Sequence, residues 1–249
     1  MLGVTAITEP VVALVFDSKD SYEKIQKTKP ELHLVEPEFV AGYYRPDTGI
    51  LYQWRQAALW HVMFPEGTHQ LVDYASKALT PDDHQETAWF SEGIADYMGG
   101  HKRTTRFSKE QNKIVKEFEL GQFIPNRFSA LQNGLMGDYA FTMKELCNLD
   151  FITFKIKYQN AQKGSSDNQL KTNMVYCQGW ALVKFLNEFQ DGKYRGQFRE
   201  YFRAEVLGEG GGEKFAEVFT LDTDEDWDDF DTEFREWVFT DLRSQKPKK

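Results

Sequence analysis

The first part of the chain alternates short apolar runs with turn-forming residues, which predicts a small sheet. Residues 11–16, VVALVF, form a continuous apolar and β-branched run, so we expect a buried strand there. Residues 41–44 and 49–54 flank the segment RPDTG, whose proline, aspartate and glycine favour a tight reversal. The pattern therefore predicts two further strands joined by a turn.

After residue 55 the apolar positions recur with helical spacing, which predicts a mainly helical body. From about Lys113 onward we expect mostly helix, with loops at residues 165–168 and 208–213. The expected fold class is thus α+β, with a small N-terminal sheet followed by helices. The clearest predicted helices cover residues 19–27 (capped by Asp17 and Ser18), 55–76, 86–98, 175–189 and an amphipathic C-terminal segment through Trp227, Phe230, Phe234, Trp237 and Val238.

Composition limits the classes of partner. The 249 residues are 41% apolar and 15% aromatic, which is typical of a globular protein. The net charge of -9 argues against a nucleic-acid partner, and no apolar run approaches the ~20 residues of a membrane span. No linker or repeat divides the chain, so we expect one domain over residues 1–243 and a flexible basic tail over 244–249.

Two cysteines, Cys147 and Cys177, are too few for a disulfide framework or a thiolate metal site. They can form one bridge or remain two buried free thiols, and the second alternative is favoured. Residues 1–10 lack the charged start and long apolar stretch of a signal peptide. We expect a soluble protein that is either intracellular or the mature part of an exported one, with Met1 as an added start.

The segment HVMFPEGTHQLVDY, residues 61–74, is one residue away from a zinc-hydrolase motif. A helix with the pattern His-Glu-x-x-His places two imidazoles on one face with a carboxylate beside them. Here Glu66 and His69 are present, but Pro65 stands where the first histidine would be. A lone Glu-x-x-His occurs by chance on many helices, so this motif alone is weak.

The next predicted helix carries a second acidic motif, WFSEGIADY. It contains Glu92, and Asp96 follows one turn later. In zinc hydrolases of this plan two histidines and a downstream glutamate bind the metal, and an acidic residue one turn later orients the first histidine. Both motifs in this order on successive helices give a much stronger signal than either alone.

These motifs resemble those of the peptidase-MA-like gluzincin metallopeptidases, including a bacterial branch known only as a domain of unknown function. PEGTHQL corresponds to the family pattern His-Glu-x-x-His-Gln-Leu, WFSEGIADY to its second motif, and YCQGWALV, from Tyr176, to a later helix. IPNRFSALQ and FTMKELCNL are also similar to that branch, and the resemblance covers about residues 11–199. It implies a gluzincin-like (zincin) fold.

The resemblance also implies roles for individual residues. His69 and Glu92 would be zinc ligands, and Glu66 the general base acting on the metal-bound water. Tyr176 would donate a hydrogen bond to the oxyanion, with a core tyrosine as the equal alternative. Asp96 would orient a first histidine that this chain lacks.

Pro65 makes the implied zinc site degenerate, because proline cannot bind metal and two protein ligands are too few for a stable zinc centre. It should kink the helix near residues 61–65, unless the helix begins there with Pro65 in its first turn. Direct binding by Asp96, a severe kink at His61, or a swing of His84 or His101 could supply a third ligand. Glu66 and Glu92 could instead form a metal-free acid–base pair.

Two functions therefore follow from the sequence. The first is a zinc-metallopeptidase-like hydrolase with a degenerate PExxH…E metal site, acting on a peptide or protein. The alternative is an inactive pseudopeptidase that uses the same cleft as a peptide- or protein-binding module. Counting ligands slightly favours the pseudopeptidase over zinc peptidase activity.

Overall fold

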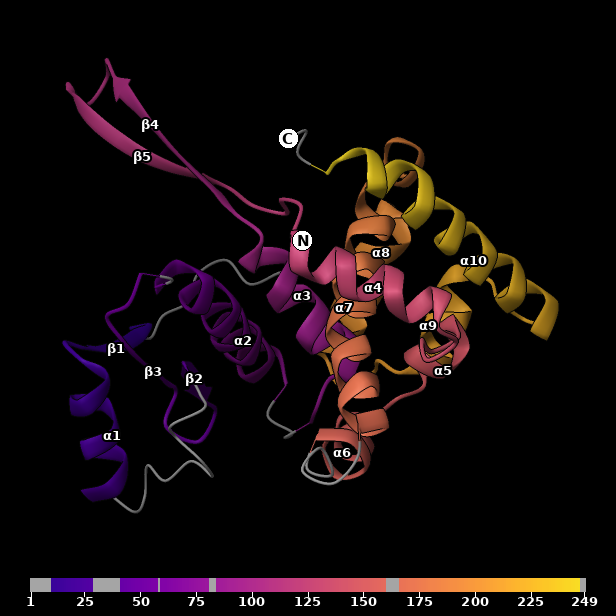
Figure 1. Cartoon of the computed structure of the whole chain (residues 1–249), viewed down its shortest axis with the longest axis horizontal. Helices are drawn as coiled ribbons and strands as arrows, with labels where there is room; N and C mark the ends of the chain where they lie inside the picture. The colour runs from indigo at the N-terminus through magenta and orange to yellow at the C-terminus, as the bar shows by residue number, and fades with distance from the viewer. Residues whose placement is uncertain (1–9, 29–40, 58, 81–83, 160–165, 247–249) are drawn as a thin grey trace.

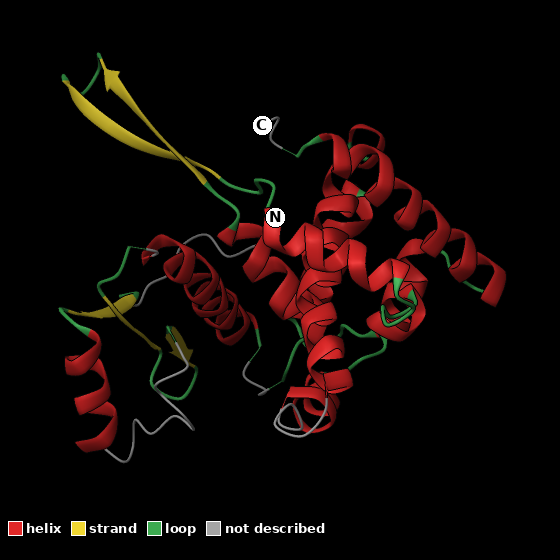
Figure 2. Ribbon diagram, viewed as in Figure 1, coloured by secondary structure: helices red, strands yellow, loops and turns green. Residues whose placement is uncertain are grey.

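The computed structural model describes residues 10–28, 41–57, 59–80, 84–159 and 166–246. It has the expected α+β architecture, with a small sheet at one end and a helical body at the other (Figure 1, Figure 2). Residue 165 of the predicted loop at 165–168 and residues 247–249 of the predicted basic tail lie outside the described residues. The N-terminal elements are β1 (Val12–Phe16), α1 (Lys19–Thr28), β2 (Gly42–Arg45), β3 (Ile50–Trp54) and α2 (Leu59–Leu79).

The remaining elements follow from α3 onward and include a hairpin, β4–β5, between the helices (Figure 2). In order they are α3 (Ala88–Gly99), β4 (Lys102–Ser108), β5 (Lys113–Glu119), α4 (Pro125–Met136), α5 (Met143–Cys147), α6 (Phe151–Thr153), the π-helical segment η3 (Phe154–Gln159), α7 (Ser166–Glu188), the 3₁₀ turn η5 (Phe189–Asp191), α8 (Arg195–Val206), α9 (Gly212–Phe219), α10 (Asp224–Trp237) and the π-helical segment η6 (Val238–Leu242). None of the described helices combines the length and apolarity needed to cross a bilayer.

The N-terminal sheet has the strand order β1-β3-β2. β1 runs parallel to β3, whereas β2 and β3 are antiparallel neighbours joined by the predicted turn at residues 46–49. Gly49 closes this turn with a φ of 68°, in the left-handed region that glycine adopts without strain. The prediction of three strands and a tight reversal is therefore confirmed.

The prediction that the first strand is buried is wrong. Val12, Leu14 and Val15 are 37%, 43% and 42% exposed. β1 lies at the edge of a sheet of only three strands, so few neighbours cover it. Tyr22 of α1 is fully buried in an aromatic cluster with Tyr43, and from β1 this cluster receives Phe16.

α2 lies between the sheet and the helical body (Figure 1). On its sheet side the buried Gln70 donates Nε2 hydrogen bonds to the carbonyl oxygens of Val12 (3.0 Å) and Gly49 (2.8 Å). On its other side it packs against α3. A buried amide bonded to β1 and to the turn before β3 fixes the rotation of α2, and with it the direction of the motif side chains.

α3 crosses α7 at a contact between two glycines. A Cβ built on Gly93 would lie 2.5 Å from the backbone carbon and oxygen of Gly179, so a side chain there would separate the helices. Around this crossing the fully buried Trp89, Phe90 and Trp180 belong to the main hydrophobic core. α3 is thus held closely against the centre of the body.

Three other sequence predictions are decided by the structure. Residues 113–119, where mostly helix was expected, instead form a strand that pairs with residues 102–108 in an antiparallel hairpin. Both strands are largely exposed, so no core-facing apolar stripe marks them in the sequence. α7 begins at Ser166, so most of the predicted loop at 165–168 is helix. The C-terminal amphipathic helix is confirmed as α10, with a capping box between Thr223 and Asp226.

Candidate functional site

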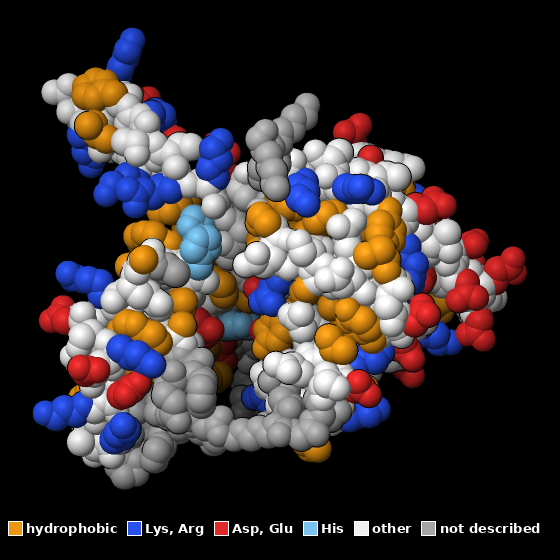
Figure 3. Space-filling model, viewed as in Figure 1, with side chains coloured by type: hydrophobic (Ala, Val, Ile, Leu, Met, Phe, Trp, Pro, Cys, Tyr) orange, Lys and Arg blue, Asp and Glu red, His pale blue; other side chains and the backbone are white. Residues whose placement is uncertain are grey.

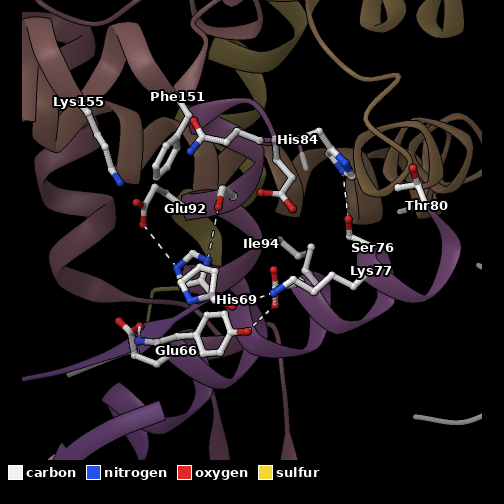
Figure 4. Close-up of a pocket in the computed structure, with 17 residues that line it drawn as sticks. Glu66, His69, Ser76, Lys77, Thr80, His84, Glu92, Ile94, Phe151 and Lys155 are labelled. Carbon is white, nitrogen blue, oxygen red and sulfur yellow. Dashed lines mark hydrogen bonds and ion pairs between the residues drawn. The ribbon is translucent and has the colours of Figure 1, made fainter. Parts of the chain in front are cut away.

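α2 and α3 bring three of the predicted site residues into one cleft of about 460 Å³ (Figure 4). Glu66 and His69 extend from α2, and Glu92 extends from α3. His69 Nε2 lies 3.8 Å from Glu92 Oε2. The expected convergence of these side chains is confirmed, while their roles as base and ligands remain predictions. The space-filling view shows the molecule hollowed between sheet and body, with acidic and histidine side chains at the hollow (Figure 3).

His69 is held as a neutral imidazole. Burial lowers its pKa to about 4, because the charged form loses its hydration. Nδ1 lies 3.4 Å from the hydroxyl of Ser91, one residue before Glu92 on α3. At neutral pH the ring can therefore accept or donate a hydrogen bond without carrying charge.

Glu66 points toward the sheet rather than into open solvent. Its Oε2 accepts a hydrogen bond of 2.8 Å from the backbone N–H of Tyr44 on β2. Burial raises its pKa to about 7, although this hydrogen bond opposes the shift. The residue predicted as general base is thus about half protonated at neutral pH and engaged by a strand backbone.

Glu92 is mostly protonated at neutral pH. Burial is the largest cause of a pKa raised to about 8, and the nearby charges of Glu66 and Asp96 add to it. A hydrogen bond from Tyr176 and the charge of Arg127 oppose the shift. A carboxyl group in this state can donate a hydrogen bond as well as accept one.

Tyr176, the predicted oxyanion donor, lies beside Glu92. Its hydroxyl is hydrogen-bonded to the Glu92 carboxyl and accepts a 3.3 Å bond from Gln159 Nε2. Tyr176 itself is not among the residues that line the cleft, and it reaches the site only through the Glu92 carboxyl. Its oxyanion role remains a prediction, because the hydroxyl is directed at a carboxyl group.

Asp96 is not directed at a metal position. Arg127 binds it with two contacts, 2.7 Å from Nε to Oδ2 and 3.1 Å from Nη2 to Oδ1. The guanidinium also lies over the ring of Tyr176, 5.0 Å from its centroid. Burial raises the pKa of the Asp96 carboxyl and Arg127 opposes that shift. Arg127 was given no role by sequence analysis, although it lies within the family-like segment IPNRFSALQ.

Pro65 is an interior residue of α2, which begins at Leu59. The predicted alternative in which Pro65 opens the helix is therefore wrong. Its ring packs toward α3, since a Cβ on Gly99 would lie 2.9 Å from Pro65 Cγ. With His61 and Asp96 it lines a second cavity of about 410 Å³, separate from the cleft.

The other histidines among the described residues do not complete a metal site. His61 and His101 pack against each other with ring centroids 4.8 Å apart, and His61 lines the second cavity. His84 lines the cleft, but its Nε2 lies 3.3 Å from the Ser76 hydroxyl. His61, His84 and His101 therefore do not supply a third imidazole to the pair His69 and Glu92.

The donor set therefore does not fit a three-ligand zinc centre. Across the described ranges, no group of three His, Cys, Asp or Glu side chains is placed to hold one ion. His69 and Glu92 supply two donors, Pro65 supplies none, and Arg127 binds Asp96. The predicted free thiols are confirmed as buried and unbridged at Cys147 and Cys177. Comparison of the chain with protein-family profiles, curated proteins and solved structures gives no match.

Proposed function

We propose that this chain is a zinc-metallopeptidase-like domain with a degenerate metal site, and that its cleft binds a peptide or protein segment without zinc-dependent turnover. The observation that carries the proposal is the position of Pro65. Pro65, at the position that the resemblance gives to the first imidazole ligand, packs against Gly99 of α3, while His69 and Glu92 lie 3.8 Å apart in the cleft. The resemblance of the motifs supports a metallopeptidase-like origin for this arrangement.

The cleft offers hydrogen-bonding groups suited to a peptide backbone. Glu92 and Glu66 have pKa values raised to about 8 and about 7, mainly by burial, so both carry protons for part of the time at neutral pH. A protonated carboxyl can donate to a peptide carbonyl, and a neutral imidazole can accept from a peptide N–H. The volume of about 460 Å³ lies within the range of ligand pockets and accommodates a few residues of an extended chain.

Zinc titration by calorimetry tests the metal part of the proposal. We expect weak or no binding to the parent and tight binding to Pro65→His, in which an imidazole at position 65 lies one turn from His69. Equal zinc binding by parent and variant would reveal a third ligand and contradict the proposal. Absence of binding by both would show that this cleft has left the metallopeptidase geometry altogether.

A peptide library tests the binding part. We expect the parent to enrich a subset of peptides and to leave them uncleaved by mass spectrometry, with or without added zinc. Glu92→Gln keeps a donor and an acceptor at this position, whereas His69→Leu removes an acceptor and should reduce enrichment about tenfold. Enrichment that is unchanged in His69→Leu would place the peptide outside the cleft.

The second candidate is a hydrolase that uses the same residues. The observation in its favour is the pair of carboxyl groups, Glu66 and Glu92, whose pKa values of about 7 and about 8 suit proton transfer near neutral pH. Cleavage of a bound peptide that is abolished by Glu66→Gln would establish this candidate in place of the binding module. If that cleavage also required zinc, the metallopeptidase interpretation would be recovered.

A further inference from the structure

The hairpin β4–β5 extends away from the rest of the molecule (Figure 1, Figure 2). At its base, Phe118 packs against the start of α2, with ring centroids 5.3 Å from Trp60 and 5.0 Å from Phe64. Seven residue pairs join the two strands, from Lys102↔Glu119 to Ser108↔Lys113. The hairpin is thus anchored at one end by aromatic packing and projects at the other.

One face of the hairpin ends in an exposed apolar pair. Phe107 and Ile114 are cross-strand partners near the tip, and they are 58% and 68% exposed. Side chains alternate between faces along a strand, so this pair lies on the same face as Thr105↔Lys116 and the anchoring Phe118. Two large apolar side chains at the end of an arm have no packing role within the described part of the chain.

The hairpin is basic in an acidic protein. Residues 102–119 contain six lysines or arginines and three glutamates, a net charge of +3, whereas the whole chain carries -9. Two of these cations are paired along the strands, Arg106 with Glu117 and Lys102 with Glu119. Among the described residues, no ion pair is formed by the other four, Arg103, Lys109, Lys113 and Lys116.

We propose that the hairpin tip docks on an anionic lipid surface. Phe107 and Ile114 would enter the interface between headgroups and acyl chains, while the lysines beside them contact lipid phosphates and carboxylates. Binding by a small apolar tip with flanking cations depends both on burial of the apolar side chains and on attraction between the cations and anionic headgroups. Such contact is peripheral and needs no helix that crosses the bilayer.

The length of the arm suits this partner. Seven paired residues span about 23 Å at the rise of a β-strand. The Debye length is about 8 Å at physiological ionic strength, so the acidic body is screened from a surface that the tip touches. A short hairpin with the same tip would bring the negative charge of the body against negative headgroups.

Two other partners fit less well. The acidic face of α10 on a second copy would attract the lysines, but none of the large exposed apolar side chains of the described residues lies on α10, so Phe107 and Ile114 would find no apolar counterpart. A nucleic acid would also attract the lysines, but an exposed isoleucine adds nothing to phosphate contacts. The apolar pair is what selects a lipid surface.

Co-sedimentation of the full chain with vesicles tests the proposal. We expect binding to phosphatidylcholine vesicles that contain about 30% phosphatidylserine, and little binding to vesicles of phosphatidylcholine alone. Lys113→Gln with Lys116→Gln should weaken binding about 30-fold, because each cation near the surface contributes roughly a factor of five. Phe107→Ser with Ile114→Ser should weaken it by at least about tenfold.

A matched control is available on the helical side of the molecule. Ile152 and Ile156 are 60% and 66% exposed, so Ile152→Ser with Ile156→Ser removes the same kind of surface at another place and should leave binding unchanged. Failure of the parent to bind anionic vesicles would overturn the proposal. Loss of binding in the lysine variant but not in the Phe107 and Ile114 variant would also overturn it, in favour of an anionic polymer. Self-association that the tip variant abolishes would overturn it too, by assigning the tip to a second copy.

Discussion

At the scale of single residues, Arg127 matters as much as Pro65, because it binds the acid that would otherwise orient a first histidine. It binds Asp96 at 2.7 and 3.1 Å and lies over Tyr176, whose hydroxyl bonds to Glu92. A guanidinium is a fixed cation with a planar set of donors, well suited to a carboxylate with two free oxygens. The acid that would orient a first histidine is therefore already neutralised by a side chain from α4.

Removal of Arg127 should destabilise the fold. In Arg127→Met the apolar packing over Tyr176 is largely kept, but Asp96 loses its partner in a buried position. We expect the free energy of unfolding, measured with urea, to fall by about 2–3 kcal/mol at pH 8. The loss should be smaller at lower pH, because burial raises the pKa of Asp96 and its protonation removes the unpaired charge.

A second substitution and a surface control separate charge from packing. Asp96→Asn in the Arg127→Met background should recover part of the loss, because it removes the uncompensated charge. Arg106→Met breaks an exposed ion pair with Glu117 and should leave the urea midpoint nearly unchanged. If Asp96→Asn does not restore any of the unfolding free energy that Arg127→Met loses, the guanidinium stabilises the fold through packing alone.

The protonated carboxyl of Glu92 predicts a pH dependence of stability. Its pKa rises from 4.5 to about 8 on folding, so the proton it binds stabilises the folded state fully below pH 4.5. That contribution is lost as pH rises toward 8, because the unfolded chain ionises first. Glu92→Gln removes this loss, and it should become more stable relative to the parent between pH 5 and pH 8, by roughly 2 kcal/mol.

Thermal unfolding at pH 5, 6, 7 and 8 would measure this difference. Glu236→Gln, on the exposed side of α10, is a suitable control and should follow the parent at every pH. His69 acts in the opposite direction between pH 4 and pH 6.5, which overlaps the lower part of the Glu92 window, because its pKa is lowered from 6.5 to about 4 and its protonation destabilises the fold. A constant difference between Glu92→Gln and the parent would show that Glu92 is ionised in the folded protein.

Residue positions on one helix were predictable, whereas contacts between elements were not. Glu66 and His69 lie three residues apart, so helical geometry alone places them on one face, and the second motif placed Glu92 nearby. The contact of Glu66 with the backbone of Tyr44 depends on how β2 meets α2, which local pattern does not encode. The same is true of the contact between Arg127 and Asp96, because nothing in the segment IPNRFSALQ indicates which acid the arginine binds.

At the scale of elements, the close crossing of α3 and α7 fixes the position of Glu92, because it fixes the position of α3. The two helices touch through Gly93 and Gly179, and Glu92 immediately precedes the first of these. In Gly93→Ala the new methyl group would lie 2.5 Å from backbone atoms of α7, so the helices must separate. We expect the free energy of unfolding to fall by about 3 kcal/mol, as for an overpacked core.

Gly67 provides the matched control, because it is also helical but a Cβ built on it would have no atom within 4 Å. Gly67→Ala should stabilise α2 by up to about 1 kcal/mol, the usual difference in helix propensity. Both variants can be measured by urea denaturation with circular dichroism. Equal behaviour of the two alanine variants would contradict the close crossing of α3 and α7.

Elements with a buried face were predicted well, and exposed ones were not. α10 and α7 carry continuous apolar stripes that pack in the core, so their periodicity was visible in the sequence. β4 and β5 have no buried face, and only their β-branched and aromatic residues hinted at strands. β1 shows the reverse error, because an apolar run predicts burial only when a neighbour covers it.

At the scale of the whole molecule, charge is distributed unevenly along its longest direction. The basic hairpin projects at one end, and α10, with Asp224, Glu225 and Asp226 in its first turn, lies at the other (Figure 1). Such a separation gives the protein a permanent electric dipole in addition to its net charge of -9. Its behaviour near a charged surface then depends on which end approaches.

This separation has a consequence for ion-exchange chromatography. Net charge alone would send the chain through a sulfonate cation exchanger at pH 7 without retention. When the hairpin faces the resin, the chain should instead be retarded on the cation exchanger at low ionic strength. It should also bind an anion exchanger through the end that carries α10. Salt at about 0.15 M should remove the retardation, since the Debye length then falls to about 8 Å. Binding to resins of both signs would show that the molecule orients itself, with the hairpin toward the negative resin and α10 toward the positive one.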